Sequence, residues 1–171
     1  MELSAPGENH ATSITIDKTI LGRIKLHKPV YSVPPVRLRF FDPYKQQLSC
    51  FIQAPAHKHI LTRVNIRKDL AIILADDQYF GFELSNPLDY LVSQHNDPID
   101  SMNRADTDEY LLMGALLEIV SDNTVEALDN DMASVANELK IKILPRIKSI
   151  RSPSRKATIK ASLEDFIDYY T

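Results

Sequence analysis

The chain has 171 residues, of which 44% are hydrophobic and 25% are charged, and its formal net charge is −3 at pH 7. These values are ordinary for one globular domain, or for one domain with a small appendage. The four glycines are too scattered for the glycine-rich loops of nucleotide-binding motifs, and the single cysteine, Cys50, excludes an internal disulfide and a multi-thiolate zinc site.

The beginning of the chain shows no sign of export. The stretch from residue 1 to residue 19 is polar and lacks the apolar segment of a signal peptide. No apolar run approaches the roughly 18 residues of a membrane span. We therefore expect residues 1–11 to form a flexible arm, and the protein to be soluble, cytoplasmic and without a membrane partner.

The charge is unevenly distributed along the chain. Residues 1–85 carry 11 Lys or Arg and 8 Asp or Glu, residues 86–138 carry 1 and 12, and residues 139–171 carry 8 and 3. The three net charges are +3, −11 and +5. This asymmetry predicts electric fields of opposite sign on different surfaces, which concerns partners rather than fold.

Residues 12–85 are predicted to form a β-rich domain. Short apolar or alternating runs predict strands over 14–17, 20–27, 36–41, 48–53, 60–66, 70–75 and 79–84. Six or seven short strands in so few residues favour an antiparallel barrel or sandwich. Asp76-Asp77 separates the last two runs and predicts a tight hairpin turn.

Residues 86–145 are predicted to form an acidic helical cap packed on this domain, which makes the chain an α+β protein. Asn86, followed by proline, predicts the start of a short helix. Capping-box patterns at Asp106 and Asn123 each precede apolar residues at helical spacing. Two amphipathic helices of four to five turns follow from these patterns, and Pro145 ends the second or its extension.

Residues 146–171 are predicted to be a flexible basic linker that ends in an amphipathic anchor peptide. The run 149–156 is basic, serine-rich and poor in apolar residues, so its burial would not offset its ordering entropy. The last stretch has apolar residues at positions i, i+3, i+4 and i+7, namely Leu163, Phe166, Ile167 and Tyr170. So short an amphipathic helix requires a groove, and we expect these four residues to bind a partner.

The polar face of the predicted strands is a second candidate site. Strand alternation places cations and aromatic rings together there, and the five strongest candidates are Arg37, Arg39, Phe41, Phe51 and Arg63. Single-stranded nucleic acids require positive charge for phosphates and flat partners for bases. Two alternatives stay open: an ordinary solvated sheet face, or a basic face that meets the acidic helical face of another copy or partner.

No residue pattern predicts catalysis, a metal or a cofactor. Cys50 falls on the apolar face of its predicted strand, where a buried thiol is inert. His57 and His59 would share a strand face, but the spacing identifies no third metal ligand, although Asp76 or Asp77 is a candidate. The aspartate-rich loop around residues 95–109 lacks the residue order of a calcium site.

The sequence therefore favours a non-enzymatic interaction protein, an adaptor or an assembly subunit. We expect it to dock on a protein partner, or on a second copy, through its C-terminal tail and its faces of complementary charge. A single-stranded nucleic-acid-binding module is the alternative. An enzyme is the weakest hypothesis, because it would require a site assembled from residues distant in sequence.

Overall fold

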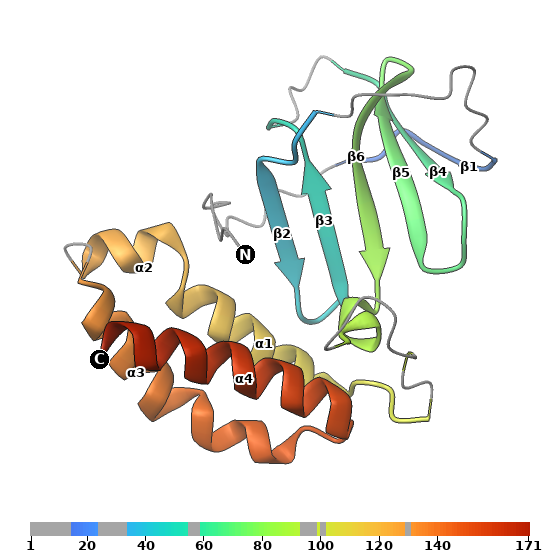
Figure 1. Ribbon diagram of the computed structural model, residues 1–171. Coiled ribbons are helices and arrows are strands. Elements are labelled where there is room, and N and C mark those ends of the chain that lie inside the picture. Colours follow the sequence, from blue (N-terminus) through green and yellow to red (C-terminus); the bar gives the residue numbers. More distant parts are fainter. Residues whose placement is uncertain (1–14, 24–33, 55–58, 93–98, 100–101, 129–130) are drawn as a thin grey trace. The chain divides into compact units, whose positions relative to one another are not determined.

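The computed structural model describes residues 15–23, 34–54, 59–92, 99, 102–128 and 131–171, so the predicted arm over 1–11 lies outside the described residues. The chain is α+β, as predicted, with strands first and helices after them (Figure 1). It divides into two compact units. The strand unit comprises Met1–Phe41 and Gln47–Ser85, and the helical unit comprises Asp42–Gln46 and Asn86–Thr171.

The strand unit contains one six-stranded sheet. Its strands are β1 (Lys18–Leu21), β2 (Leu38–Asp42), β3 (Gln47–Phe51), β4 (Leu61–Asn65), β5 (Leu70–Ala75) and β6 (Gln78–Ser85). They lie in the order β1-β4-β5-β6-β3-β2. Because β1 and β2 are the two edges and do not pair, the sheet is open, and the predicted barrel is wrong.

The sheet is mixed rather than wholly antiparallel. β1 lies parallel to β4, whereas β4 pairs with β5, β5 with β6 and β6 with β3 in antiparallel fashion. The chain builds β2 and β3 before it reaches β4, so β1 and β4 are joined by a long crossover and not by a hairpin. The alternation of side chains along a strand shows which residues share a face, but it does not show that β1 pairs with β4.

Aromatic and aliphatic side chains form the core of the strand unit. Its buried members are Phe51, Leu61, Ile73 and Phe80. The ring centroid of Phe51 lies 5.9 Å from that of Phe40 and 5.5 Å from that of Phe80. Beside Phe51 in the sheet, a Cβ at Gly81 would lie 2.1 Å from the carbonyl oxygen of Cys50, so only glycine fits there.

The predicted turn at Asp76-Asp77 is confirmed. The two residues join β5 to β6, and their φ angles are 48° and 65°, the left-handed values of a type I′ turn. Asp76 also ties the turn to the chain before β4: its Oδ1 accepts a hydrogen bond from the amide of Ile60 at 3.0 Å, and its Oδ2 lies 2.6 Å from Nδ1 of His59. These bonds help to hold Asp76 in a conformation that non-glycine residues rarely adopt.

Among the described residues, the helical unit contains two 3-10 helices and four α-helices. Its elements are η1 (Pro87–Tyr90), α1 (Thr107–Ile119), α2 (Asp122–Ala127), α3 (Met132–Lys142), η2 (Leu144–Ser149) and α4 (Pro153–Tyr170). The predicted cap of α1 is confirmed, because the Asp106 carboxylate accepts from the amide of Glu109 at 3.0 Å.

The second predicted helix is two helices. α2 ends at Ala127 and α3 begins at Met132. Ser121 caps α2 by accepting from the amide of Thr124, and Asp131 caps α3 by accepting from the amide of Ala133 at 3.1 Å. The apolar residues keep helical spacing across the break, so spacing alone does not expose the second cap.

The predicted flexible linker is wrong. Residues 144–149 form η2, and α4 begins at Pro153 and runs for 18 residues. Ser152 is buried and caps α4, because its hydroxyl accepts from the amide of Arg155 at 3.3 Å. Arg155 is also buried, so two polar residues that suggested a solvated linker are part of the packed unit.

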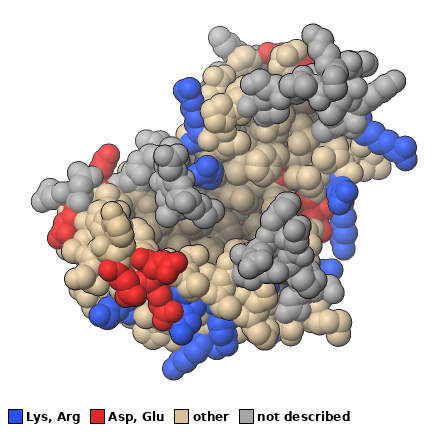
Figure 2. Space-filling view, in the orientation of Figure 1, with Lys and Arg blue, Asp and Glu red and all other residues tan. Residues whose placement is uncertain are grey.

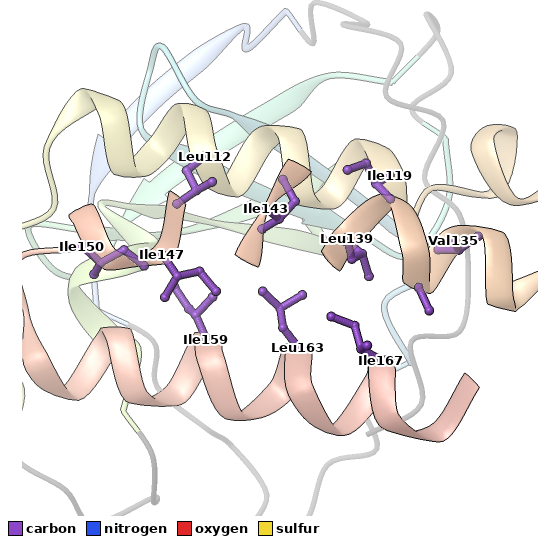
Figure 3. Packing of buried hydrophobic residues seen from close by; sticks show 11 residues of the cluster. Leu112, Ile119, Val135, Leu139, Ile143, Ile147, Ile150, Ile159, Leu163 and Ile167 are labelled. Carbon is purple, nitrogen blue, oxygen red and sulfur yellow. The ribbon is translucent and has the colours of Figure 1, made fainter. Parts of the chain in front are cut away.

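A single apolar cluster joins α1, α3, η2 and α4. Its buried members are Leu112, Ile119, Val135, Ala136, Leu139, Ile143, Ile147, Ile150, Ile159, Leu163 and Ile167. Figure 3 shows that the side chains of Ile159, Leu163 and Ile167 leave α4 toward the other helices. Burying each such side chain stabilises the fold by about 1.5–3 kcal/mol, so α4 is part of the core of the helical unit.

Candidate functional site

The beginning of α4 is fixed by a buried ion pair. The Nε of Arg155 donates to Oε2 of Glu109 on α1 at 2.7 Å, and both side chains are almost fully buried. The other guanidinium nitrogens donate to the backbone carbonyls of Leu88 at 3.3 Å and Asn103 at 2.9 Å. The remaining Glu109 oxygen, Oε1, accepts from the amide of Arg151 at 2.9 Å. These bonds connect α1, η1, the chain before α1 and the start of α4.

The four predicted anchor residues lie on α4 but do not form one exposed surface. Leu163 and Ile167 are each 5% exposed and belong to the core, so they do not reach a partner from this position. Phe166 is half-buried against the same core, whereas Tyr170 is 36% exposed. The predicted apolar stripe is confirmed as a helix face, but its groove is formed by this chain's own helices.

An aromatic cluster remains at the surface near the end of α4. It consists of Phe166, Tyr169 and Tyr170. The ring centroid of Tyr170 lies 4.8 Å from that of Phe166 and 4.7 Å from that of Tyr169. Tyr169 is 80% exposed. The apolar stripe in the sequence does not include Tyr169, because this residue lies on the side of the helix that turns away from the core.

The outer side of α4 carries four charges at intervals of four residues. We call Lys156, Lys160, Glu164 and Asp168 the charged stripe, since residues four apart are neighbours on a helix surface. Lys160 and Asp168 are exposed, and Lys156 and Glu164 are partly exposed, with Nζ of Lys156 donating to the backbone carbonyl of Lys148 at 2.9 Å. Figure 2 shows acidic side chains gathered over the C-terminal half of α4. Within the stripe, the Nζ of Lys160 lies 3.4 Å from a carboxylate oxygen of Glu164.

The order of these charges does not suit the helix itself. A helix dipole favours acidic residues near its N-terminus and basic residues near its C-terminus, by about 0.3–1 kcal/mol for each charge. α4 has no acidic residue in its first turn and no basic residue in its last turn. Lys156 and Lys160 precede Glu164 and Asp168, which is the unfavourable order for an i, i+4 pair as well.

The residues predicted for nucleic acid lie on two different faces of the sheet. Phe51 and Arg63 share a cross-strand row with Gly81 and Ile73, on the face that holds the aromatic core. Phe51 is 0% exposed, and Nε of Arg63 lies 3.0 Å from Oε2 of the buried Glu83. Neither side chain presents the free stacking surface or free charge that a nucleic acid requires.

The other three predicted residues lie on or beside the edge strand β2. Leu38 and Phe40 pack against the aromatic core, so the alternation of the strand turns Arg39 and Phe41 toward the opposite face. Arg37 and Arg39 are exposed. The structure therefore does not bring the five residues together. Both faces of this sheet carry apolar residues, so the alternation in the sequence does not show which face holds the core.

Of the groups considered for catalysis or metal binding, Cys50 is buried, and His59 and Asp76 contact each other through Nδ1 and Oδ2 at 2.6 Å. Cys50 is 3% exposed, and burial raises the pKa of its thiol to about 11. Among the described residues, no group of three or more His, Cys, Asp or Glu could hold a metal ion, and His57 lies outside them. A small cavity between Leu88, Leu112 and Ile159 has a volume of about 10 Å³, the room for about one water.

Comparison of the chain with known protein families, with curated proteins and with solved structures finds no significant match. Within the part of the chain that the structure describes, no helix has both the length and the apolar character needed to cross a membrane. The candidate site therefore rests on the structure alone. It is the outer side of α4, which carries the charged stripe and the exposed aromatic cluster.

Proposed function

We propose that this protein is a non-enzymatic interaction protein, an adaptor or assembly subunit, that docks on another protein chain through the outer side of α4. The observation that carries the proposal is the contrast between the two sides of this helix. Arg155, Leu163 and Ile167 are buried on the inner side. The outer side presents the charged stripe and Tyr169 on a helix that is already folded.

A folded recognition helix lowers the entropic cost of binding, because its backbone is not ordered at the moment of association. Exposed tyrosines supply contact area with few rotatable bonds, and they are frequent at the centre of protein interfaces. The aromatic cluster and the charged stripe together offer both an apolar contact and a charge pattern that selects the partner and its orientation.

Site-specific photo-crosslinking tests the proposal. p-Benzoylphenylalanine in place of Tyr169 is expected to give one discrete protein adduct in the native cells. The same probe in place of Tyr44 is the matched control, because Tyr44 is also 80% exposed but lies on the turn between β2 and β3. Reversing the charge of Lys160 and Asp168 is expected to abolish the adduct, since the interface depends on the stripe. No adduct at position 169, or equal adducts at both positions, overturns the proposal.

A further inference from the structure

We infer that the partner of α4 is a second copy of this chain, whose α4 lies antiparallel to the first across a two-fold axis. The inference rests on the proposed function and adds the identity of the partner. It follows from the arrangement of the charged stripe, which is basic at Lys156 and Lys160 and acidic at Glu164 and Asp168.

The stripe is complementary to itself when one copy is reversed. Equal spacing of four residues places the midpoint of the stripe between Lys160 and Glu164 on the helix surface. A two-fold axis between these two residues sets Lys156 of each copy opposite Asp168 of the other, and Lys160 opposite Glu164. All four charges of each copy then meet an opposite charge, and both copies use the same patch, as a closed two-fold interface requires.

The antiparallel arrangement also explains the order of charges that the isolated helix disfavours. The basic half of each stripe lies near the positive end of its own helix dipole, and the acidic half near the negative end. In an antiparallel pair, each acidic half lies beside the positive end of the partner helix. The charges therefore interact unfavourably with the dipole of their own helix and favourably with the dipole of the second copy. A parallel arrangement would instead set like charges side by side.

The surface between the charges allows the two helices to approach. The i, i+4 series forms a ridge on a helix, and in the commonest class of helix contact the ridges of this kind on the two helices interdigitate. Ala157 and Ala161 are exposed beside the ridge and present little side-chain bulk. A helix of 18 residues is about 27 Å long, so contact along it is small, and we expect a concentration-dependent dimer with a dissociation constant of micromolar order.

Paired charge reversals test the inference in the full chain. One variant carries Lys156→Glu and Lys160→Glu, and the other carries Glu164→Lys and Asp168→Lys. Each alone is expected to be monomeric by sedimentation velocity, because its stripe has one sign. An equimolar mixture is expected to restore a dimer that contains one of each. Each variant agrees better with the helix dipole, but it also breaks the Lys160–Glu164 pair and places like charges four residues apart, so its melting temperature is expected to stay close to that of the wild type.

A matched control reverses two exposed lysines of the strand unit, Lys18→Glu and Lys68→Glu, and is expected to dimerise like the wild type. The wild-type dimer is expected to dissociate as salt rises from about 0.05 M to about 1 M, where charges are screened beyond about 3 Å. A monomeric wild type at low salt, or a mixture that stays monomeric, overturns the inference.

The crosslink at position 169 separates the inference from the proposed function. An adduct of twice the 19.4-kDa chain mass is the expected result. An adduct with a different protein overturns self-association and leaves the proposed interaction function supported. The absence of any discrete adduct overturns both.

Discussion

Arg155 and Glu109 are 46 residues apart in the chain and form an ion pair of 2.7 Å inside the helical unit. Removing one partner leaves an uncompensated charge in a buried site, which costs about 3–5 kcal/mol. We therefore expect Arg155→Met or Glu109→Leu to lower the free energy of unfolding by that amount, measured by urea denaturation. The double variant is expected to be more stable than either single one. If a single variant loses less than about 1 kcal/mol of unfolding free energy, which is the value of an exposed ion pair, the pair does not act as a buried one.

The same pair explains why the C-terminal segment was misjudged from the sequence. Composition treats every arginine and serine as solvated, and residues 149–156 contain mostly such residues. The burial of Arg155 depends on Glu109, a partner that no local pattern reveals. A local signal did exist, because Ser152 followed by proline is the same start pattern that predicted a helix at Asn86.

The cap of α4 provides a second prediction. The Ser152 hydroxyl accepts from the amide of Arg155 and is buried. Ser152→Ala removes this bond and is expected to lower the free energy of unfolding by about 1 kcal/mol. Ser162→Ala is the matched control, because Ser162 is exposed in the middle of the same helix and alanine is the better helix former. Equal effects of the two substitutions on the urea midpoint would show that the cap is dispensable.

The turn between β5 and β6 provides a third prediction. Asp77 has a φ of 65°, which glycine adopts without the steric cost that a side chain incurs. Asp77→Gly is expected to raise the free energy of unfolding by about 0.5–1 kcal/mol, measured by thermal and urea denaturation. Asp77→Val is the control, and a β-branched residue at this φ is expected to destabilise the hairpin. A glycine variant less stable than the wild type would refute the explanation.

Prediction from sequence succeeded for the strands of the sheet and failed for its faces. Turn residues and β-branched runs located the strands from β2 to β6 within a few residues. Cys50 and Phe51 point to opposite faces, yet they are 3% and 0% exposed. When consecutive residues are both buried, alternation does not reveal the solvated side, and Phe51 was therefore assigned to the polar face.

Cys50 provides a fourth prediction. Burial raises the pKa of its thiol to about 11, so the thiolate fraction at pH 8 is about one in a thousand. The folded protein is expected to react with a thiol reagent only as fast as it opens, and full reaction is expected in denaturant. Reaction is followed by the absorbance of the released chromophore. Rapid reaction of the folded chain, at the rate seen in denaturant, would contradict the burial of this thiol.

Tyr110 provides a fifth prediction, because its phenol is buried in the helical unit. Burial, with a smaller contribution from the carboxylate of Asp89, raises the pKa of Tyr110 to about 12. The unfolded chain releases this proton near pH 10 and the folded chain near pH 12. The stabilisation is therefore complete below pH 10 and is lost as the pH rises through 12, a change of about 3 kcal/mol.

Urea midpoints measured between about pH 9 and about 12 test this prediction. Tyr110→Phe removes the titrating group and is expected to flatten the alkaline decline. It is also expected to be less stable than the wild type below pH 10, because it loses the hydrogen bond of the phenol to the backbone of Leu88. Tyr169→Phe is the control for the loss of a tyrosine hydroxyl, because Tyr169 is 80% exposed. Parallel pH profiles for the wild type and the Tyr110 variant would mean that the phenol titrates alike in the folded and unfolded chains.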